Sequence, residues 1–156
     1  DYARRDLDTI RRTVIRSLVS VCALLLAVAA ILYAVRGPLL RLVFLHGQMD
    51  EAGVERMANL LGYHLVGLAP FGALLVLARA HVATRNGRIM ISMGLLNTGT
   101  NAVGNFILLH VLGLEGLALA TSIVHLVVAV VFWFRFEARL RELRNAPPEV
   151  AREEAA

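Results

Sequence analysis

The run SLVSVCALLLAVAAILYAV, residues 17–35, decides the fold class. It contains nineteen residues and no charged side chain. An α-helix of that length rises about 28 Å, close to the thickness of the hydrocarbon core of a bilayer. A helix at the surface of a soluble bundle would need a charged stripe along one face. The run has none, so it predicts a helix that crosses a membrane.

The whole chain has the composition of a membrane protein. Of its 156 residues, 58% are hydrophobic, whereas soluble domains contain about 45–50%. Charged residues gather at 1–16, 36–56, 79–88 and 135–154, and the stretches between are almost free of charge. All sixteen basic residues are arginine, and they lie at the ends of apolar runs. A nucleic-acid surface would instead gather them on one face with aromatics between them, which argues against that partner.

Three further apolar runs follow the first one. We expect four membrane spans, at residues 17–35, 51–78, 88–111 and 116–134. Gly37 and Pro38 are expected to end the first span. Asp50 is placed to cap the second, and Pro70 is expected to kink it because proline has no N–H for the carbonyl four residues earlier. The link of residues 112–115 is so short that the last two spans are predicted to form an antiparallel hairpin.

Arginines orient the four spans. With four crossings, twelve arginines fall on one side of the membrane. They are Arg4, Arg5, Arg11, Arg12, Arg16, Arg79, Arg85, Arg88, Arg135, Arg139, Arg141 and Arg144. The opposite side has only Arg36, Arg41 and Arg56. Because arginine-rich flanks stay on the cytoplasmic side, both chain ends are predicted to be cytoplasmic.

The same pattern divides the chain into three parts. Residues 1–16 form a cytoplasmic flank, residues 17–137 form the four-helix transmembrane region, and residues 138–156 form a cytoplasmic tail. The tail ends in NAPPEVAREEAA, which is polar and broken by prolines. We therefore expect a disordered tail. The predicted fold class is all-α, a polytopic helical bundle in a membrane.

Three asparagines lie along one face of the third span. Asn97, Asn101 and Asn105 follow one another at a spacing of four residues. Polar side chains are costly in lipid, so this face must meet protein or water. One interpretation is hydrogen bonding between helices, helped by the small glycines interleaved with the asparagines. The other is that the asparagines line a polar cavity or a cation site.

A cation site would combine both spans of the hairpin. The turn places Asn101 and Thr121 at similar depth near the bilayer centre. Asn101, Asn105 and Thr121, together with the backbone carbonyl of Leu117, offer the oxygen ligands that small hard cations prefer. These spans contain no carboxylate, so one would have to come from another part of the protein. The coupling ion, Na⁺ or H⁺, is left open.

Two histidines lie inside the spans. His64 and His125 can relay protons, since imidazole titrates near neutral pH, or can simply pack between helices. His81 lies near the end of a span and is expected to have no special role. The sequence contains no nucleotide-binding loop, catalytic triad, paired carboxylates or metal-ligand spacing. We therefore expect no enzyme, no bound metal and no organic cofactor.

Two stretches carry a family resemblance. They are PLLRLVFLHGQMDEAGVERMANLLGYHLVGLAPFGALLVLARAHVATRNGR at residues 38–88 and GLLNTGTNAVGNFILLHVLGLEGLALATSI at residues 94–123. Over roughly residues 1–137 the chain resembles the MurJ (MviN) family of lipid II flippases. The resemblance implies the last four helices of a two-lobed, twelve-helix transporter of the bacterial inner membrane. Such a protein moves a lipid-linked peptidoglycan precursor to the outer leaflet by alternating access.

The resemblance also bears on partners and on the cation site. It implies a lipid-linked substrate, surrounding membrane lipids and earlier helices of the same protein that meet the substrate pyrophosphate. In some relatives a cation is held in the second lobe, and Asn101, Asn105 and Thr121 match that pattern by position. Two alternatives stay open. One is another exporter of the same superfamily, for drugs or oligosaccharide lipids, and the other is a non-transporting membrane scaffold.

Overall fold

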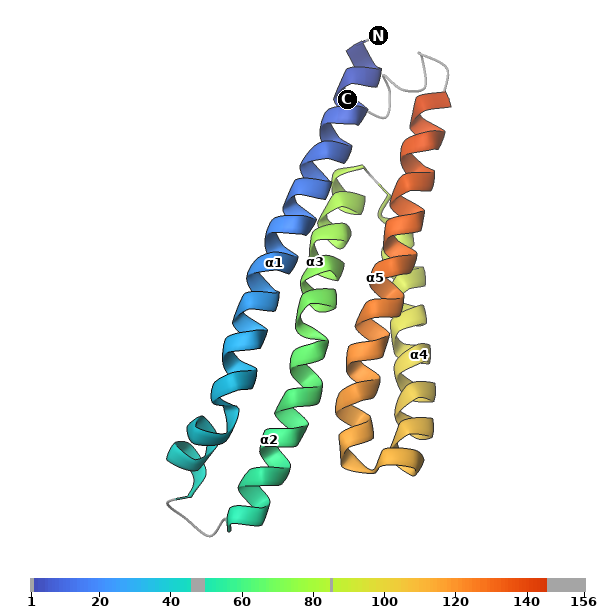
Figure 1. The fold of residues 1–156 in the computed structure, drawn as a ribbon. Helices are drawn as coiled ribbons and strands as arrows, with labels where there is room; N and C mark the ends of the chain where they lie inside the picture. The colour runs from blue at the N-terminus through green and yellow to red at the C-terminus, as the bar shows by residue number, and fades with distance from the viewer. Residues whose placement is uncertain (1, 46–49, 85, 146–156) are drawn as a thin grey trace.

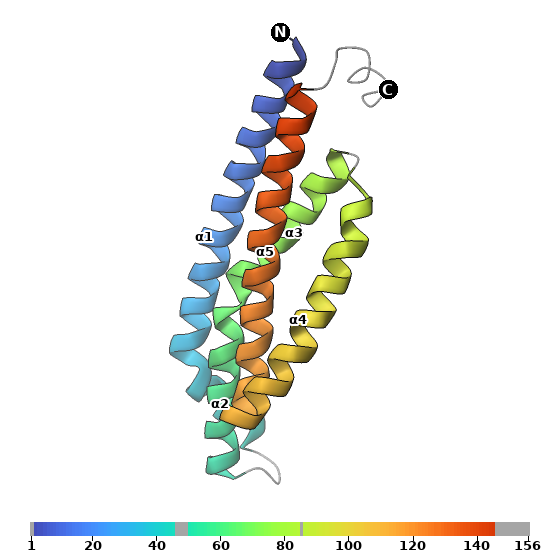
Figure 2. The ribbon, with the colours of Figure 1, turned by 90° about the vertical axis from the view of Figure 1, so that its right-hand side faces the viewer.

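Five α-helices make up the computed structural model, which describes residues 2–45, 50–84 and 86–145. The helices are α1 (Tyr2–Phe44), α2 (Glu51–Val66), α3 (Leu68–Ala83), α4 (Arg88–Leu112) and α5 (Leu114–Asn145). They lie side by side in an elongated bundle (Figures 1 and 2). Because α3 continues the direction of α2, the chain passes along the bundle four times. This architecture confirms the predicted all-α membrane bundle.

Three of the four passes are long and apolar enough to cross a membrane. Among the described residues these stretches are Asp6–Phe44, Glu51–Ala83 and Leu114–Asn145. The remaining pass, α4, is 25 residues long, and so is long enough to span. It carries the asparagine face, which makes it less apolar than the other passes. Its main packing partner is α5, and the two form the predicted hairpin around Gly113 (Figure 2).

The outer faces of the bundle are apolar. Leu24, Ile91, Leu95, Phe106 and Phe134 each expose more than half of their surface. A soluble protein rarely exposes so much apolar surface. Lipid chains are the natural neighbours of these side chains.

The prediction that the first helix ends at Gly37 and Pro38 was wrong. The helix continues to Phe44. Proline removes one N–H, which here would have bonded the carbonyl of Ala34. One residue earlier, the carbonyl of Tyr33 accepts a hydrogen bond from Arg36 Nη1 at 2.6 Å. This hydrogen bond lies on the carbonyl next to the one that the proline leaves without a donor, and the helix continues past both.

The second pass is interrupted at Gly67, not kinked at Pro70. Pro70 lies in the first turn of α3, where the N–H that it lacks would have had no helical partner. The interruption therefore falls three residues before the proline. Asp50 caps α2 as predicted, because its carboxylate accepts a hydrogen bond from the Gly53 amide at 2.9 Å.

The last helix extends into the predicted tail. Residues 138–145 continue α5, so this part of the tail is helical and the expectation of disorder was wrong there. The segment is rich in arginine, glutamate and leucine, which favour helix, and Arg139 pairs with Glu142 at 3.4 Å. Residues 146–156, together with Arg85 of the arginine count, lie outside the described residues. The flank of residues 1–16 is helical from Tyr2 onward.

Candidate functional site

The junction between α2 and α3 touches α5 backbone to backbone. A β-carbon built on Gly67 would lie 2.8 Å from Cα and 2.6 Å from Oγ of Ser122. Only glycine fits at such a separation. On the α5 side the contact is made by Ser122, a small buried residue. The broken helix is thus held against α5 near the middle of the bundle.

Ser122 also donates a hydrogen bond to a backbone carbonyl that loses its helical donor at the break. The Gly67 amide bonds back to the carbonyl of His64 at 3.0 Å, so the Tyr63 carbonyl loses the donor that a continuous helix would give it. Ser122 Oγ donates to this carbonyl at 2.8 Å. On the opposite side, the Cys22 thiol of α1 lies 3.7 Å from the carbonyl of Ala69. Irregular backbone at membrane depth requires such partners.

Replacing Ser122 by alanine tests this contact. The Tyr63 carbonyl would lose its donor, whereas the smaller alanine side chain would still fit against Gly67. We therefore expect a loss of about 0.5–1.5 kcal/mol in the free energy of unfolding. Unfolding of the chain in micelles, followed by circular dichroism, measures it. Ser20→Ala is the matched control, because Ser20 is exposed on α1. Equal losses in the two variants would contradict a role for the hydroxyl.

The asparagine face forms its hydrogen bonds within α4. Asn105 Nδ2 donates to Asn101 Oδ1 at 2.6 Å. Asn105 Oδ1 is buried and has no hydrogen-bond partner in the described part of the chain. Asn97 lies one turn earlier and is half-buried. The structure therefore brings Asn101 and Asn105 together and leaves one amide oxygen available.

The facing residues of α5 are close to this pair. Gly104 packs against Ala120, with 3.6 Å between a β-carbon built on the glycine and that of the alanine. This contact brings the turn of α5 that carries Thr121 to the level of Gly104. Thr121 Oγ1 donates to the Leu117 carbonyl at 3.1 Å. The hydrogen bonds of Thr121 and of the asparagines stay within their own helices, and in the described residues no hydrogen bond joins the two sets of oxygens.

The histidines lie in different surroundings. His125 packs against Phe71, with ring centroids 5.0 Å apart, while His64 is exposed on α2. His81, for which we expected no special role, is a central packing residue with an exposed fraction of 0%. Its Nε2 lies 3.0 Å from the Phe132 carbonyl, and its ring contacts those of Phe132 and Phe136.

Sequence reasoning missed His81 and Ser122. Both are ordinary residues within apolar runs, and their importance comes from the helix packed against them. The only available signals were the glycine at position 67 and the small residues around position 80. In the described residues no three His, Cys, Asp or Glu side chains gather in a way that would hold a metal ion.

Together these features define a multi-pass α-helical membrane protein with a broken helix and a half-buried polar face on α4. The model of one protein family, the lipid II flippase MurJ, matches residues 1–147. The chain therefore belongs to the MurJ lipid II flippase family, and the predicted resemblance is confirmed. Comparison with curated proteins and with solved structures found no significant match.

Proposed function

We propose that this chain works within a flippase that carries lipid II across the bacterial inner membrane by alternating access. The observation that carries the proposal is the family match over residues 1–147. Both described chain ends and the α3–α4 link lie at one end of the bundle (Figure 1). The arginine-rich flanks therefore share one side, which supports a cytoplasmic location for both ends.

The broken helix supports alternating access. A transporter of this kind must let helices change their relative angle while the backbone stays satisfied. The Gly67 junction supplies a point at which α2 and α3 can pivot, because the helix hydrogen bonds are already interrupted there. Ser122 provides a partner on α5 for the open carbonyl.

Depletion of the full-length protein in its host tests the proposed substrate. We expect peptidoglycan synthesis to stop, lipid II to accumulate on the cytoplasmic leaflet, and cells to lyse. Incorporation of a labelled wall precursor and labelling of surface-exposed lipid II measure these effects, and a second gene copy is the control. Normal growth with normal wall labelling would contradict the proposal and favour an exporter of another substrate, or a scaffold.

We propose further that the asparagine face helps to hold a coupling cation. Asn105 Oδ1 fits this role, because it is a buried acceptor to which no group in the described residues donates a hydrogen bond. Asn101 Oδ1 is bonded to Asn105, and Thr121 and the Leu117 carbonyl are the oxygens proposed from α5, a donor set that suits Na⁺. Bound there, a cation would draw α4 and α5 together and so favour one arrangement of the hairpin. A proton carried by His64 or His125 is the alternative coupling ion.

Asn101→Leu in the full protein tests the cation proposal. The substitution removes one proposed oxygen ligand and the acceptor of the Asn105 hydrogen bond. We therefore expect the sodium concentration for half-maximal transport to rise at least about tenfold. A loss of that size is common even for residues that only support the metal ligands. Transport measured against sodium concentration checks it. Asn97→Leu, one turn earlier on the same face, is the matched control. An unchanged sodium dependence would remove Asn101 from the site.

A further inference from the structure

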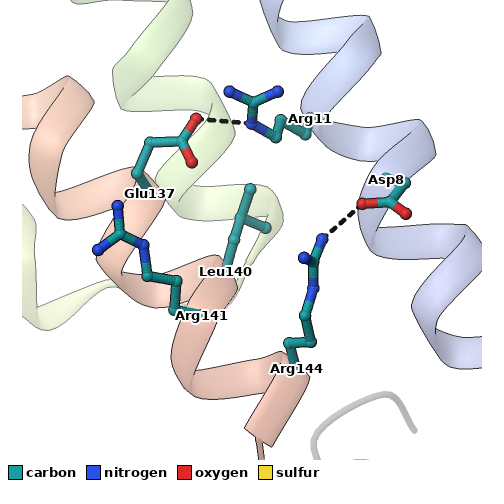
Figure 3. A pocket seen from close by; sticks show the side chains of 6 residues that line it. All are labelled: Asp8, Arg11, Glu137, Leu140, Arg141 and Arg144. Atoms are coloured by element: carbon teal, nitrogen blue, oxygen red, sulfur yellow. Dashed lines mark hydrogen bonds and ion pairs between the residues drawn. The ribbon is translucent and has the colours of Figure 1, made fainter.

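A hollow of about 350 Å³ lies between the two longest helices, at the arginine-rich end of the bundle. It is lined by Asp8 and Arg11 from α1 and by Glu137, Leu140, Arg141 and Arg144 from α5 (Figure 3). The transport function proposed above uses none of these residues. The hollow is therefore a separate feature of the molecule.

The hollow contains more positive than negative charge. Two ion pairs cross it, Arg11 Nε to Glu137 Oε1 at 2.7 Å and Arg144 Nη2 to Asp8 Oδ1 at 2.5 Å. Arg141 forms no ion pair in the described part of the chain. Three guanidinium groups thus face two carboxylates, which leaves one uncompensated positive charge.

The paired arginines also keep unused donors. A guanidinium has five N–H groups in a planar fork, and each of these ion pairs occupies one nitrogen. The remaining N–H groups of Arg11 and Arg144 are still available to a ligand. A phosphate group, with several acceptor oxygens, matches such forks well. A carboxylate would compete with the two that are already present.

The depth of the hollow indicates the source of the phosphate. The apolar run of α1 begins at Ser17, six residues after Arg11, and that of α5 ends at Phe134, three residues before Glu137. At 1.5 Å per residue, Arg11 and Glu137 lie about 9 and 5 Å beyond the apolar runs, and Arg141 and Arg144 lie about 10 and 15 Å beyond the end of the α5 run. The headgroup layer of each leaflet is about 5–8 Å thick. The edge of the hollow nearest the membrane therefore reaches the level of the lipid phosphates.

We propose that this hollow binds the phosphate of an anionic phospholipid from the leaflet facing the arginine-rich end. Arg141 supplies the unpaired charge, and Arg11 and Arg144 supply further N–H donors from the two helices. Leu140, the one apolar residue of the lining, is buried and belongs to the hydrophobic core beneath the arginines. Basic pockets between transmembrane helices on the cytoplasmic side are suited to such headgroups. The bound lipid links the start of α1 to the end of α5.

The single tryptophan of the chain provides a direct measurement. Trp133 lies one helical turn before Glu137 on α5, so lipids bound at the hollow place their acyl chains near it. The chain is reconstituted in vesicles with brominated phosphatidylglycerol or brominated phosphatidylcholine, whose bromine atoms quench tryptophan fluorescence. The ratio of quenching gives the binding preference for the anionic lipid. We expect the wild-type chain to prefer phosphatidylglycerol severalfold.

Arg141→Gln is expected to reduce this preference about fivefold, the contribution of one arginine near an anionic membrane surface. Arg141→Lys keeps the charge and should retain much of it. Arg12→Gln is the matched control, because Arg12 is an exposed arginine of α1 outside the hollow. Equal reductions in the Arg12 and Arg141 glutamine variants would mean diffuse attraction and overturn the proposal. Loss of the preference on adding inorganic phosphate at unchanged ionic strength would also overturn it, by assigning the hollow to a free anion.

Discussion

Replacing Gly67 by alanine is expected to destabilise the bundle by about 2–4 kcal/mol, combining overpacking with the loss of one hydrogen bond. The new β-carbon would lie 2.6 Å from Oγ and 2.8 Å from Cα of Ser122, so α5 must move away. That movement also separates Ser122 from the Tyr63 carbonyl, which it now meets at 2.8 Å. Equilibrium unfolding in mixed micelles, followed by circular dichroism, measures the loss. Transport by the full-length protein should fall in parallel.

Two variants define the cause of this loss. Gly99→Ala is the matched control, because a β-carbon there meets nothing within 4 Å, and alanine should stabilise the helix by up to about 1 kcal/mol. Adding Ser122→Gly to Gly67→Ala removes the clashing Cβ and Oγ and should restore part of the stability. If Gly67→Ala were as stable as Gly99→Ala, the close contact with α5 would not exist.

Replacing Phe136 by alanine is expected to cost about 3–5 kcal/mol, the usual loss for a fully enclosed phenylalanine. Phe136 has an exposed fraction of 0% and is the largest of the fully buried side chains. Its ring meets the edge of His81 and the ring of Trp133. Its removal leaves a cavity where α3 and α5 meet. The same unfolding measurement reports the loss, and Trp133 fluorescence reports the local change.

Phe134→Ala is a control two residues away on the same helix. Phe134 exposes 67% of its surface towards the lipid, so its removal creates no internal cavity and should cost far less than the loss of Phe136. Phe136→Leu keeps most of the buried volume and should lie between the two alanine variants. Equal losses at positions 134 and 136 would contradict the packing described for α5.

The order of the helical passes could be predicted from the sequence, because charge and apolar length decide it, and in the described residues three of the four passes are apolar enough to cross a membrane. The hairpin followed from the short link at residues 112–115, which leaves no other connection. The exact interruption of the second pass did not follow. Pro70 marks where a helix lacks an N–H, but the first turn of a helix tolerates that loss. The break lies in the turn before Pro70, where Ser122 of α5 closely approaches Gly67, and this approach depends on tertiary packing.

The candidate site was predictable only in part. The spacing of Asn101 and Asn105 follows from helix geometry alone, so their hydrogen bond could be anticipated. Whether Thr121 and the Leu117 carbonyl can bind the same cation as the asparagines depends on the distance between two helices. The spacing of residues within one helix does not reveal that distance. His81 shows the same limit, because its burial depends on the two phenylalanines of α5. The ion pairs between α1 and α5 join residues more than a hundred positions apart.

The polarity of α4 has a consequence for the biogenesis of the protein. A nascent helix enters the bilayer from the translocon when its summed transfer free energy is favourable, and polar residues near its centre oppose entry. Three asparagines make α4 a poor candidate for entering alone. The turn at Gly113 joins it directly to α5, which is apolar enough to enter. The two helices are therefore expected to leave the translocon as one unit, so that α5 carries the asparagine-bearing helix into the lipid.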